Sequence, residues 1–141
     1  MPVQPLAVEP DEVGLAVCIY GESLAPPSIT AILGREPTHS HLKGEVDAIH
    51  NRPYPKGAWL YELRRFEPID LEAMFEELFA PLPQQQSVWQ SLAEQYELRL
   101  HLAIHTERGC GFHLSPKTMQ LVASRHAEVF LDIYAYGSSD A

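Results

Sequence analysis

Strands dominate the hydrophobic pattern of this chain. The clearest is Glu97–Thr106, where leucine or isoleucine at every second position alternates with polar residues, as in a strand with one covered and one wetter face. Two further runs are apolar at nearly every position, which is typical of strands covered on both faces. The whole pattern predicts five strands: Val13–Tyr20, Ala58–Arg64, Glu97–Thr106, Cys110–Leu114 and Ala127–Tyr136.

Helices are predicted where apolar residues recur every three or four positions behind a capping residue. The strongest is Leu71–Ala80, which has one continuous apolar face and Asp70 as its N-cap. Three more helices are expected: Ile29–Leu33 between Ser28 and Gly34, a helix from Ser87 to about Tyr96 opened by a capping box at Ser87–Gln90, and a helix from Pro116 to about Arg125 capped by Ser115.

This order of elements predicts an α+β fold. An alternating strand needs one face against helices, so we expect a mostly antiparallel sheet with helices packed mainly on one face. The arrangement we favour is a relative of the ferredoxin-like fold with an extra helix pair. Residues 1–12, rich in proline and acids, are expected to be a loosely ordered N-terminal lead-in, and residues 13–137 a single domain.

Composition narrows the function. The chain has 141 residues and a formal net charge of −9, which disfavours general binding to nucleic acid or to an anionic membrane. Neither a signal peptide nor a membrane span is expected, because no apolar run is long enough. Cys18 and Cys110 are too few and too far apart for a disulfide framework or a zinc knuckle, so we expect reduced thiols and a cytoplasmic location.

One stretch resembles a known family. The run Gly21–Gly34 (GESLAPPSITAILG) is followed by Arg35–Glu45 (REPTHSHLKGE), then by Trp59, and near the end by Leu131–Tyr134 (LDIY). This succession resembles the bacterial domain of unknown function that is numbered four-two-seven-nine. The resemblance implies one intracellular bacterial domain over nearly the whole chain. It implies no catalytic residue and no ligand.

The segment 34–57 is the preferred candidate for function. It contains three prolines, three glycines and three histidines and shows no sustained helical or strand period. From Gly34 to Arg65 there are six basic and four acidic residues, on an otherwise acidic chain. A basic loop of this kind can hold a small anion or an acidic side chain. The predicted ligand or partner site is Arg35, Thr38, His39, His41, Lys43, Glu45, Arg52 and Trp59, with Trp59 or Tyr54 as a flat wall.

The alternative is that this loop folds back on the sheet with its charges solvated or paired internally. Known catalytic motifs do not compete with either interpretation. Ser23 lies in a G-x-S sequence, but Pro26 and Pro27 delay the helix that a nucleophile elbow needs, and His126-Ala-Glu128 lacks the cysteine pair of zinc deaminases. No phosphate-binding glycine loop is present.

Three histidines could share the polar face of the sheet. Pairing Glu97–Thr106 with Cys110–Leu114 places His113 opposite Ala103, beside His101 and His105. His101 and His105 are four residues apart in one strand, about 13 Å, so they cannot both bind one zinc ion. We therefore expect no metal and no cofactor.

Three functions remain open. The first is a non-enzymatic binding module that uses the 34–59 loop to hold a small anion or a protein partner. The second is an immunity-like antitoxin that binds a basic protein through the acidic 66–97 region, with Glu72, Glu76 and Glu77 on an outer helix face. The third is a small hydrolytic enzyme in which His39 or His41 acts as acid or base, although the sequence identifies no partner to orient either. A homodimer is also possible.

Overall fold

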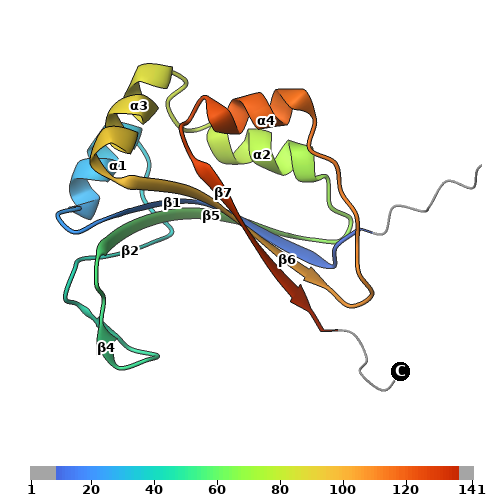
Figure 1. The fold of residues 1–141 in the computed structure, drawn as a ribbon, viewed down its shortest axis with the longest axis horizontal. Coiled ribbons are helices and arrows are strands. Elements are labelled where there is room, and N and C mark those ends of the chain that lie inside the picture. Colours follow the sequence, from blue (N-terminus) through green and yellow to red (C-terminus); the bar gives the residue numbers. More distant parts are fainter. Residues whose placement is uncertain (1–8, 137–141) are drawn as a thin grey trace, which may run out of the picture.

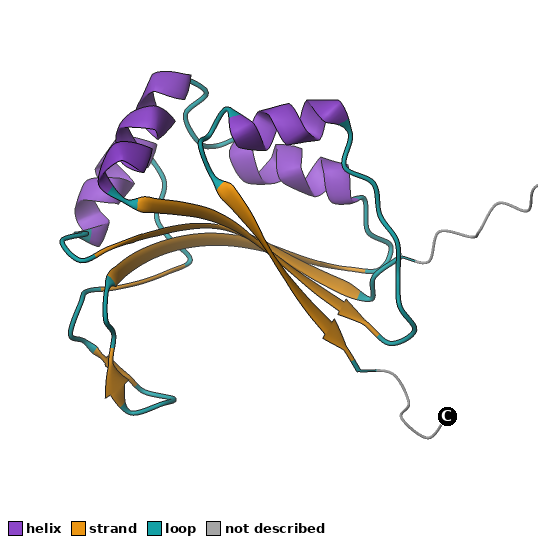
Figure 2. Ribbon diagram, in the orientation of Figure 1, coloured by secondary structure: helices purple, strands orange, loops and turns teal. Residues whose placement is uncertain are grey.

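The computed structural model describes residues 9–136, which form a curved five-stranded sheet with helices on one face (Figures 1 and 2). The sheet has the strand order β2-β5-β1-β6-β7, and β3 and β4 form a separate two-stranded hairpin. The strands are β1 (Glu12–Gly21), β2 (His39–His41), β3 (Val46–Asp47), β4 (Arg52–Pro53), β5 (Gly57–Phe66), β6 (Glu97–Thr106) and β7 (Glu128–Ala135). The helices are α1 (Pro26–Leu33), α2 (Leu71–Phe79), α3 (Gln86–Gln95) and α4 (Pro116–Ala123).

The sheet is built around β1. This strand pairs antiparallel with β5 on one side and with β6 on the other, and β2 adds antiparallel to β5. The one parallel pair is β6 with β7, which α4 connects. The α+β class, the mostly antiparallel sheet and the helices on one face are thus confirmed, and the likeness to a ferredoxin-like arrangement stays a prediction.

The alternation along the strands decides which face is covered. Odd-numbered positions of β1 and even-numbered positions of β6 point toward the helices and are buried, together with the apolar face of α2. Trp59, Trp89 and Phe75 are the largest side chains enclosed there. Burying a side chain of this size stabilises the fold by about 1.5–3 kcal/mol. The core residues are Val13, Leu15, Val17, Ile19, Leu98, Leu100, Leu102, Ile104, Trp59, Phe75, Leu78 and Leu92 among others.

Two helix starts differ from prediction. The first helix begins at Pro26 with Ala25 as N-cap, because two prolines fix the first helical φ angles and need no amide partner there, so Ser28 is not the cap. The third begins at Gln86, and the capping box expected at Ser87 does not form. The Asp70 and Ser115 caps are confirmed, and Gly34 ends α1 in the left-handed region at φ 72°.

The predicted strand Cys110–Leu114 is wrong. These residues form no strand, because the place beside β6 is taken by β7, where Ala103 faces Asp132. His113 therefore does not share a sheet face with His101. A second correction concerns segment 34–57, expected to have no regular structure: it contains β2 and the β3–β4 hairpin, whose strands of two or three residues are too short to leave a period in the sequence.

Residues 1–8 of the expected lead-in lie outside the described residues, which start at Glu9. The Glu9 carboxylate accepts a hydrogen bond from the Ile69 amide at 2.6 Å, and the Asp11 amide donates to the His105 carbonyl at 2.8 Å. The described chain has no helix long and apolar enough to cross a membrane.

Candidate functional site

The segment that follows α1 is held along the edge of the sheet. The Thr38 amide donates to the Leu60 carbonyl at 2.7 Å, and the Thr38 hydroxyl accepts from the Glu62 amide at 2.9 Å. Beyond β2 the chain leaves the sheet as an arm, residues 42–56, that carries the β3–β4 hairpin (Figure 1). The Tyr54 amide donates to the Glu45 carbonyl at 2.8 Å and the Gly44 amide donates to the Tyr54 carbonyl at 2.9 Å, and these two bonds close the base of this arm.

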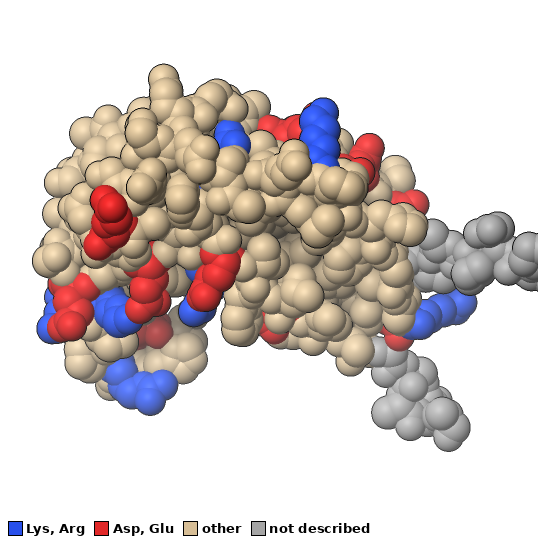
Figure 3. All heavy atoms as spheres, turned by 45° about the horizontal axis from the view of Figure 1, so that its top comes forward, with Lys and Arg blue, Asp and Glu red and all other residues tan. Residues whose placement is uncertain are grey.

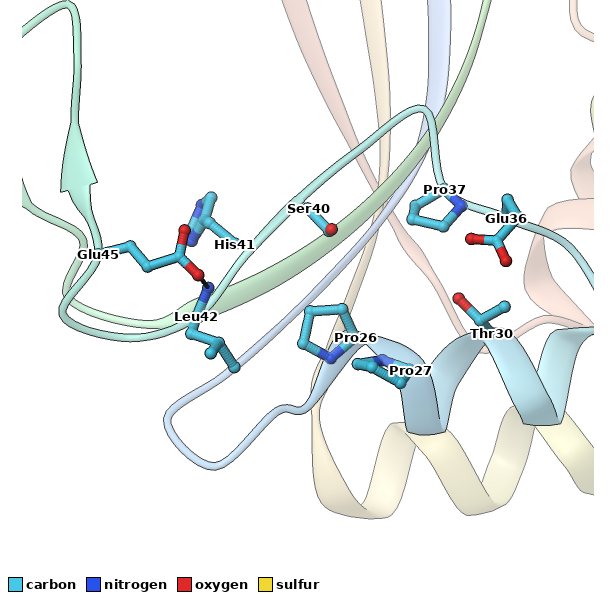
Figure 4. A pocket seen from close by; sticks show the side chains of 9 residues that line it. All are labelled: Pro26, Pro27, Thr30, Glu36, Pro37, Ser40, His41, Leu42 and Glu45. Carbon is cyan, nitrogen blue, oxygen red and sulfur yellow. Dashed lines mark hydrogen bonds between the residues drawn. The ribbon is translucent and has the colours of Figure 1, made fainter.

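A cavity of about 420 Å³ opens between this segment and the first turns of α1, and we call it the α1 pocket (Figure 4). Glu36 and Glu45 lie at opposite ends of it, with Ser40 between them and Thr30 beside Glu36. The lining contains no Lys and no Arg. The full lining is Pro26, Pro27, Thr30, Glu36, Pro37, Ser40, His41, Leu42 and Glu45.

Two polar groups of the α1 pocket already have partners. The Glu45 carboxylate accepts a hydrogen bond from the Leu42 amide at 3.1 Å, and the Thr30 hydroxyl accepts from the Trp59 indole N–H at 3.1 Å. Glu36 has no hydrogen bond or ion pair to another described side chain. The pocket thus combines one partly used and one unused carboxylate, a set that suits a hydrogen-bond donor or a cation.

His41 forms one wall of the pocket. Its ring stacks on Tyr54, with centroids 3.4 Å apart and planes 7° from parallel, and the His39 ring lies edge-on to it at 6.1 Å. Burial lowers the pKa of His41 below its ordinary value. The Nδ1 atom is buried and finds no hydrogen-bond partner within residues 9–136. The lowered pKa favours the uncharged ring at neutral pH, which makes His41 a poor cation for an anionic ligand.

The cations predicted for the site do not converge on it. Lys43 binds Glu22 at 2.7 Å, and the Arg35 guanidinium lies 5.5 Å from the centre of the Tyr61 ring. Arg52 lies on β4, out on the arm. Trp59 is fully buried in the core instead of forming a flat wall. Of the predicted residues, only His41 and Glu45 line the α1 pocket, and His39 lies beside His41. Ser40 and Glu36, which also line the pocket, were not predicted as site residues.

A second polar cluster lies on the face of the sheet that carries no helix, which we call the open face. His101 Nε2 is 3.3 Å from the Asp132 carboxylate, and the Tyr134 hydroxyl donates to the same carboxylate at 2.6 Å. This hydrogen bond lowers the pKa of Asp132 and raises the pKa of Tyr134. His105 stacks on Tyr134 with centroids 4.7 Å apart. Asp132, an acid inside an apolar strand, was the sequence signal for this cluster.

Other chemically interesting groups have structural roles. Cys18 lies at a β1 position on the open-face side of the sheet, but its side chain is fully buried. This burial raises the pKa of its thiol, so Cys18 is not an activated nucleophile. His50 pairs with Asp47 at 2.6 Å on the exposed arm. The part of the chain that the structure describes holds no group of three or more metal-ligating side chains.

The acidic face of α2 is also engaged. Glu72 accepts hydrogen bonds from the Ser115 amide at 2.7 Å and the Thr118 hydroxyl at 2.6 Å, which lower its pKa to about 2. Glu77 pairs with Arg65 at 2.6 Å, and Glu76 lies 3.4 Å from Lys117. Each of these acids thus has a partner within the chain.

Comparison with known proteins identifies the family. The sequence profile of a domain of unknown function (DUF4279) matches residues 11–136, which span both the α1 pocket and the open face. The chain belongs to the DUF4279 family. No curated protein and no solved structure matches it. The family resemblance predicted from Gly21–Glu45 is confirmed, and DUF4279 itself carries no assigned activity.

Proposed function

We propose that this DUF4279 protein is a binding module that holds a basic side chain of a protein partner in the α1 pocket. The observation that carries the proposal is the charge of the lining: Glu36 and Glu45 face a cavity of about 420 Å³ that contains no Lys or Arg. Of the two ligands expected for the 34–59 loop, a small anion and a protein partner, this lining favours the partner.

The pocket is large enough for this role. Sites for small ligands have volumes of about 300–1,000 Å³, and the end of a lysine or arginine side chain is smaller than that. A guanidinium or ammonium at either end of the pocket would form charge-assisted hydrogen bonds with the carboxylate at that end, and the Ser40 hydroxyl adds an acceptor between the two ends. The apolar parts of Pro26, Pro27 and Leu42 would contact the methylene stem. The net charge of −9 favours approach of a basic partner.

Binding is favoured over catalysis at this site. A general base needs a group that orients it, and within the described residues neither His39 nor His41 hydrogen-bonds to a carboxylate. We infer a cytoplasmic, bacterial setting for this module, on the two thiols that the structure leaves unpaired and on the family resemblance.

An NMR titration tests the proposal. ¹⁵N-labelled protein is titrated with N-acetyl-arginine methylamide, with its neutral isostere N-acetyl-citrulline methylamide, and with inorganic phosphate. We expect the arginine probe to shift the amide signals of Thr30, Ser40 and Leu42 in a saturable way, and the citrulline probe to bind at least several-fold more weakly because it lacks the charge.

Paired variants show whether the two carboxylates are responsible. In the double variant Glu36→Gln, Glu45→Gln the arginine-dependent shifts should be lost, while the amide oxygen of Gln at 45 still accepts from the Leu42 amide. Glu94→Gln, on exposed α3, removes the same type of charge away from the pocket and should leave the shifts unchanged. Phosphate-induced shifts at Arg35 and Lys43 without an arginine response would contradict the proposal and restore the anion interpretation.

A further inference from the structure

We propose that two copies of this protein pair along β7, antiparallel and about a two-fold axis at Leu131, so that their sheets join into one. The inference is independent of the α1 pocket. It starts from the position of β7, an eight-residue strand at the end of the strand order with no neighbour on its outer side within residues 9–136. Figure 1 shows β7 running across the sheet at this edge.

The backbone of β7 is free to accept a second strand. The Tyr136 amide donates to the Thr106 carbonyl at the end of β6, at 3.1 Å. Because successive residues of a strand point their N–H and C=O groups to opposite sides, even-numbered residues of β7 face β6. Val129, Leu131 and Ile133 therefore direct their amide and carbonyl groups outward, where no described residue meets them.

The side chains along this edge are apolar and exposed, with 43–59% of each surface accessible: Val129, Phe130, Leu131, Ile133 and Tyr134. Natural sheets protect a free edge with charges, prolines, bulges or short strands, and β7 has two acids and none of the other devices. Each acid already has a partner in its own chain, Glu128 with Arg99 and Asp132 with His101.

An apolar groove continues this edge onto the helix layer. A cavity of about 230 Å³ lies between β7 and α4, lined by Phe75, Val122 and Val129 among others, and the exposed Met119 borders it. Figure 3 shows this side of the molecule as a broad area with few charged atoms, while Lys, Arg, Asp and Glu gather at its margins. An edge and a groove that are both apolar suit a partner surface of the same character, which a second copy offers.

The charge pattern of β7 selects the register. Outward-facing residues must lie opposite one another, so only odd-numbered residues can pair with odd ones. With Leu131 on the two-fold axis, Val129 faces Ile133 of the partner subunit and Leu131 faces Leu131 of the partner subunit. All pairs on the helix side are then apolar, and neither acid lies opposite an acid.

Neighbouring registers are less favourable. With Phe130 on the axis, Glu128 would face Asp132 of the partner subunit. With Asp132 on the axis, two aspartates would oppose each other at the closer, non-hydrogen-bonded spacing of about 4.5 Å. Like charges directly opposite destabilise a strand pair. Placing Ile133 on the axis avoids opposing acids, but it pairs fewer residues of the strand than the axis at Leu131 does.

A charge-exchange experiment tests both the surface and the register. Leu131→Lys and Leu131→Glu are made separately, and their masses in solution are measured by light scattering over a range of concentrations. Wild-type protein should have twice the chain mass of 15.9 kDa. Each variant alone should have the single-chain mass, because like charges would meet at the axis, and an equimolar mixture of the two should recover the double mass as a heterodimer.

Controls separate this result from misfolding. Leu131 is half exposed, so both variants should keep the wild-type circular dichroism spectrum. Ile49→Lys and Ile49→Glu make the same changes at an 87% exposed residue on the arm and should leave the dimer intact. A monomeric wild-type protein at all concentrations would overturn the proposal, since another occupant must then cover β7. So would dimeric single variants, and a mixture that stays monomeric would overturn the axis at Leu131.

Discussion

The two edges of the sheet are terminated in different ways. On one side β2 has only three residues, two of them histidine, and the chain leaves the sheet at once for the arm. On the other side β7 has eight residues and exposes apolar side chains on both faces. The β2 edge is therefore closed by its own chain, with the α1 pocket formed where the segment passes α1. Within residues 9–136 no segment covers the β7 edge, which agrees with the proposed pairing with a second copy.

The largest expected contrast is in stability. Trp59 lies on β5 beside β2 and is fully buried, so Trp59→Ala should lower the free energy of unfolding by about 3–5 kcal/mol. Leu131→Lys at the β7 edge should lower it by less than about 0.5 kcal/mol at a concentration where the protein is monomeric. Urea denaturation of both variants measures this. Comparable losses would show that β7 belongs to the core as much as β5 does.

The next effect concerns the helix that positions β7, because α4 is bound to α2 through Glu72. The pKa of this carboxyl is lowered to about 2, below its unfolded value, so the stabilisation is complete above about pH 4.5 and is lost as the pH falls toward 2. Glu72→Gln should therefore melt at a lower temperature than wild type at pH 7, and the difference should shrink toward pH 2. Glu94→Gln, an exposed control, should show no such trend.

A smaller effect is expected at the β2 edge. Thr38→Val keeps the shape of the side chain but removes the hydroxyl that accepts from the Glu62 amide. The loss of this hydrogen bond should cost about 1 kcal/mol and speed hydrogen exchange at Glu62. Thr38→Ser retains the acceptor and should exchange like wild type. Protection of Glu62 in the valine variant would mean that β2 is held by its backbone bonds alone.

The smallest effect should come from the arm. Lys43 and Glu22 form an exposed ion pair, which solvent and salt screen. Lys43→Met should therefore leave the melting temperature unchanged within error at physiological salt. If binding of the arginine probe also stays unchanged, Lys43 takes no part in the α1 pocket; a clear change in binding would place it there.

Much of the fold was predictable because its long elements carry strong periods. The alternation in Glu97–Thr106 and the apolar face of α2 each specify an element and its buried side, and both are confirmed. The run Cys110–Leu114 alternates too, but a local pattern does not say which strand takes the place beside β6. In the structure β7 takes this place, and its Asp132 carboxylate lies 3.3 Å from His101 of β6.

The candidate site was harder to predict because charged residues of the loop form ion pairs with residues far away in the sequence. Lys43 meets Glu22, and Lys56 pairs with Glu97, so a count of charges along the loop gave a basic segment where the folded pocket is acidic. Trp59 was expected as an exposed wall, yet its place opposite Ile19 in the register carries it into the core. Neither partner is visible from the sequence of the loop alone.

The strand order has a consequence for how the proposed dimer would recognise its targets. Because β2 and β7 are opposite edges, joining two copies at β7 leaves the two α1 pockets at the far ends of one ribbon, roughly 40 Å apart at about 4.8 Å per strand. A target with two basic side chains at that spacing would gain avidity, since capture of the first raises the effective concentration of the second. Targets with closely spaced basic residues would engage one end only.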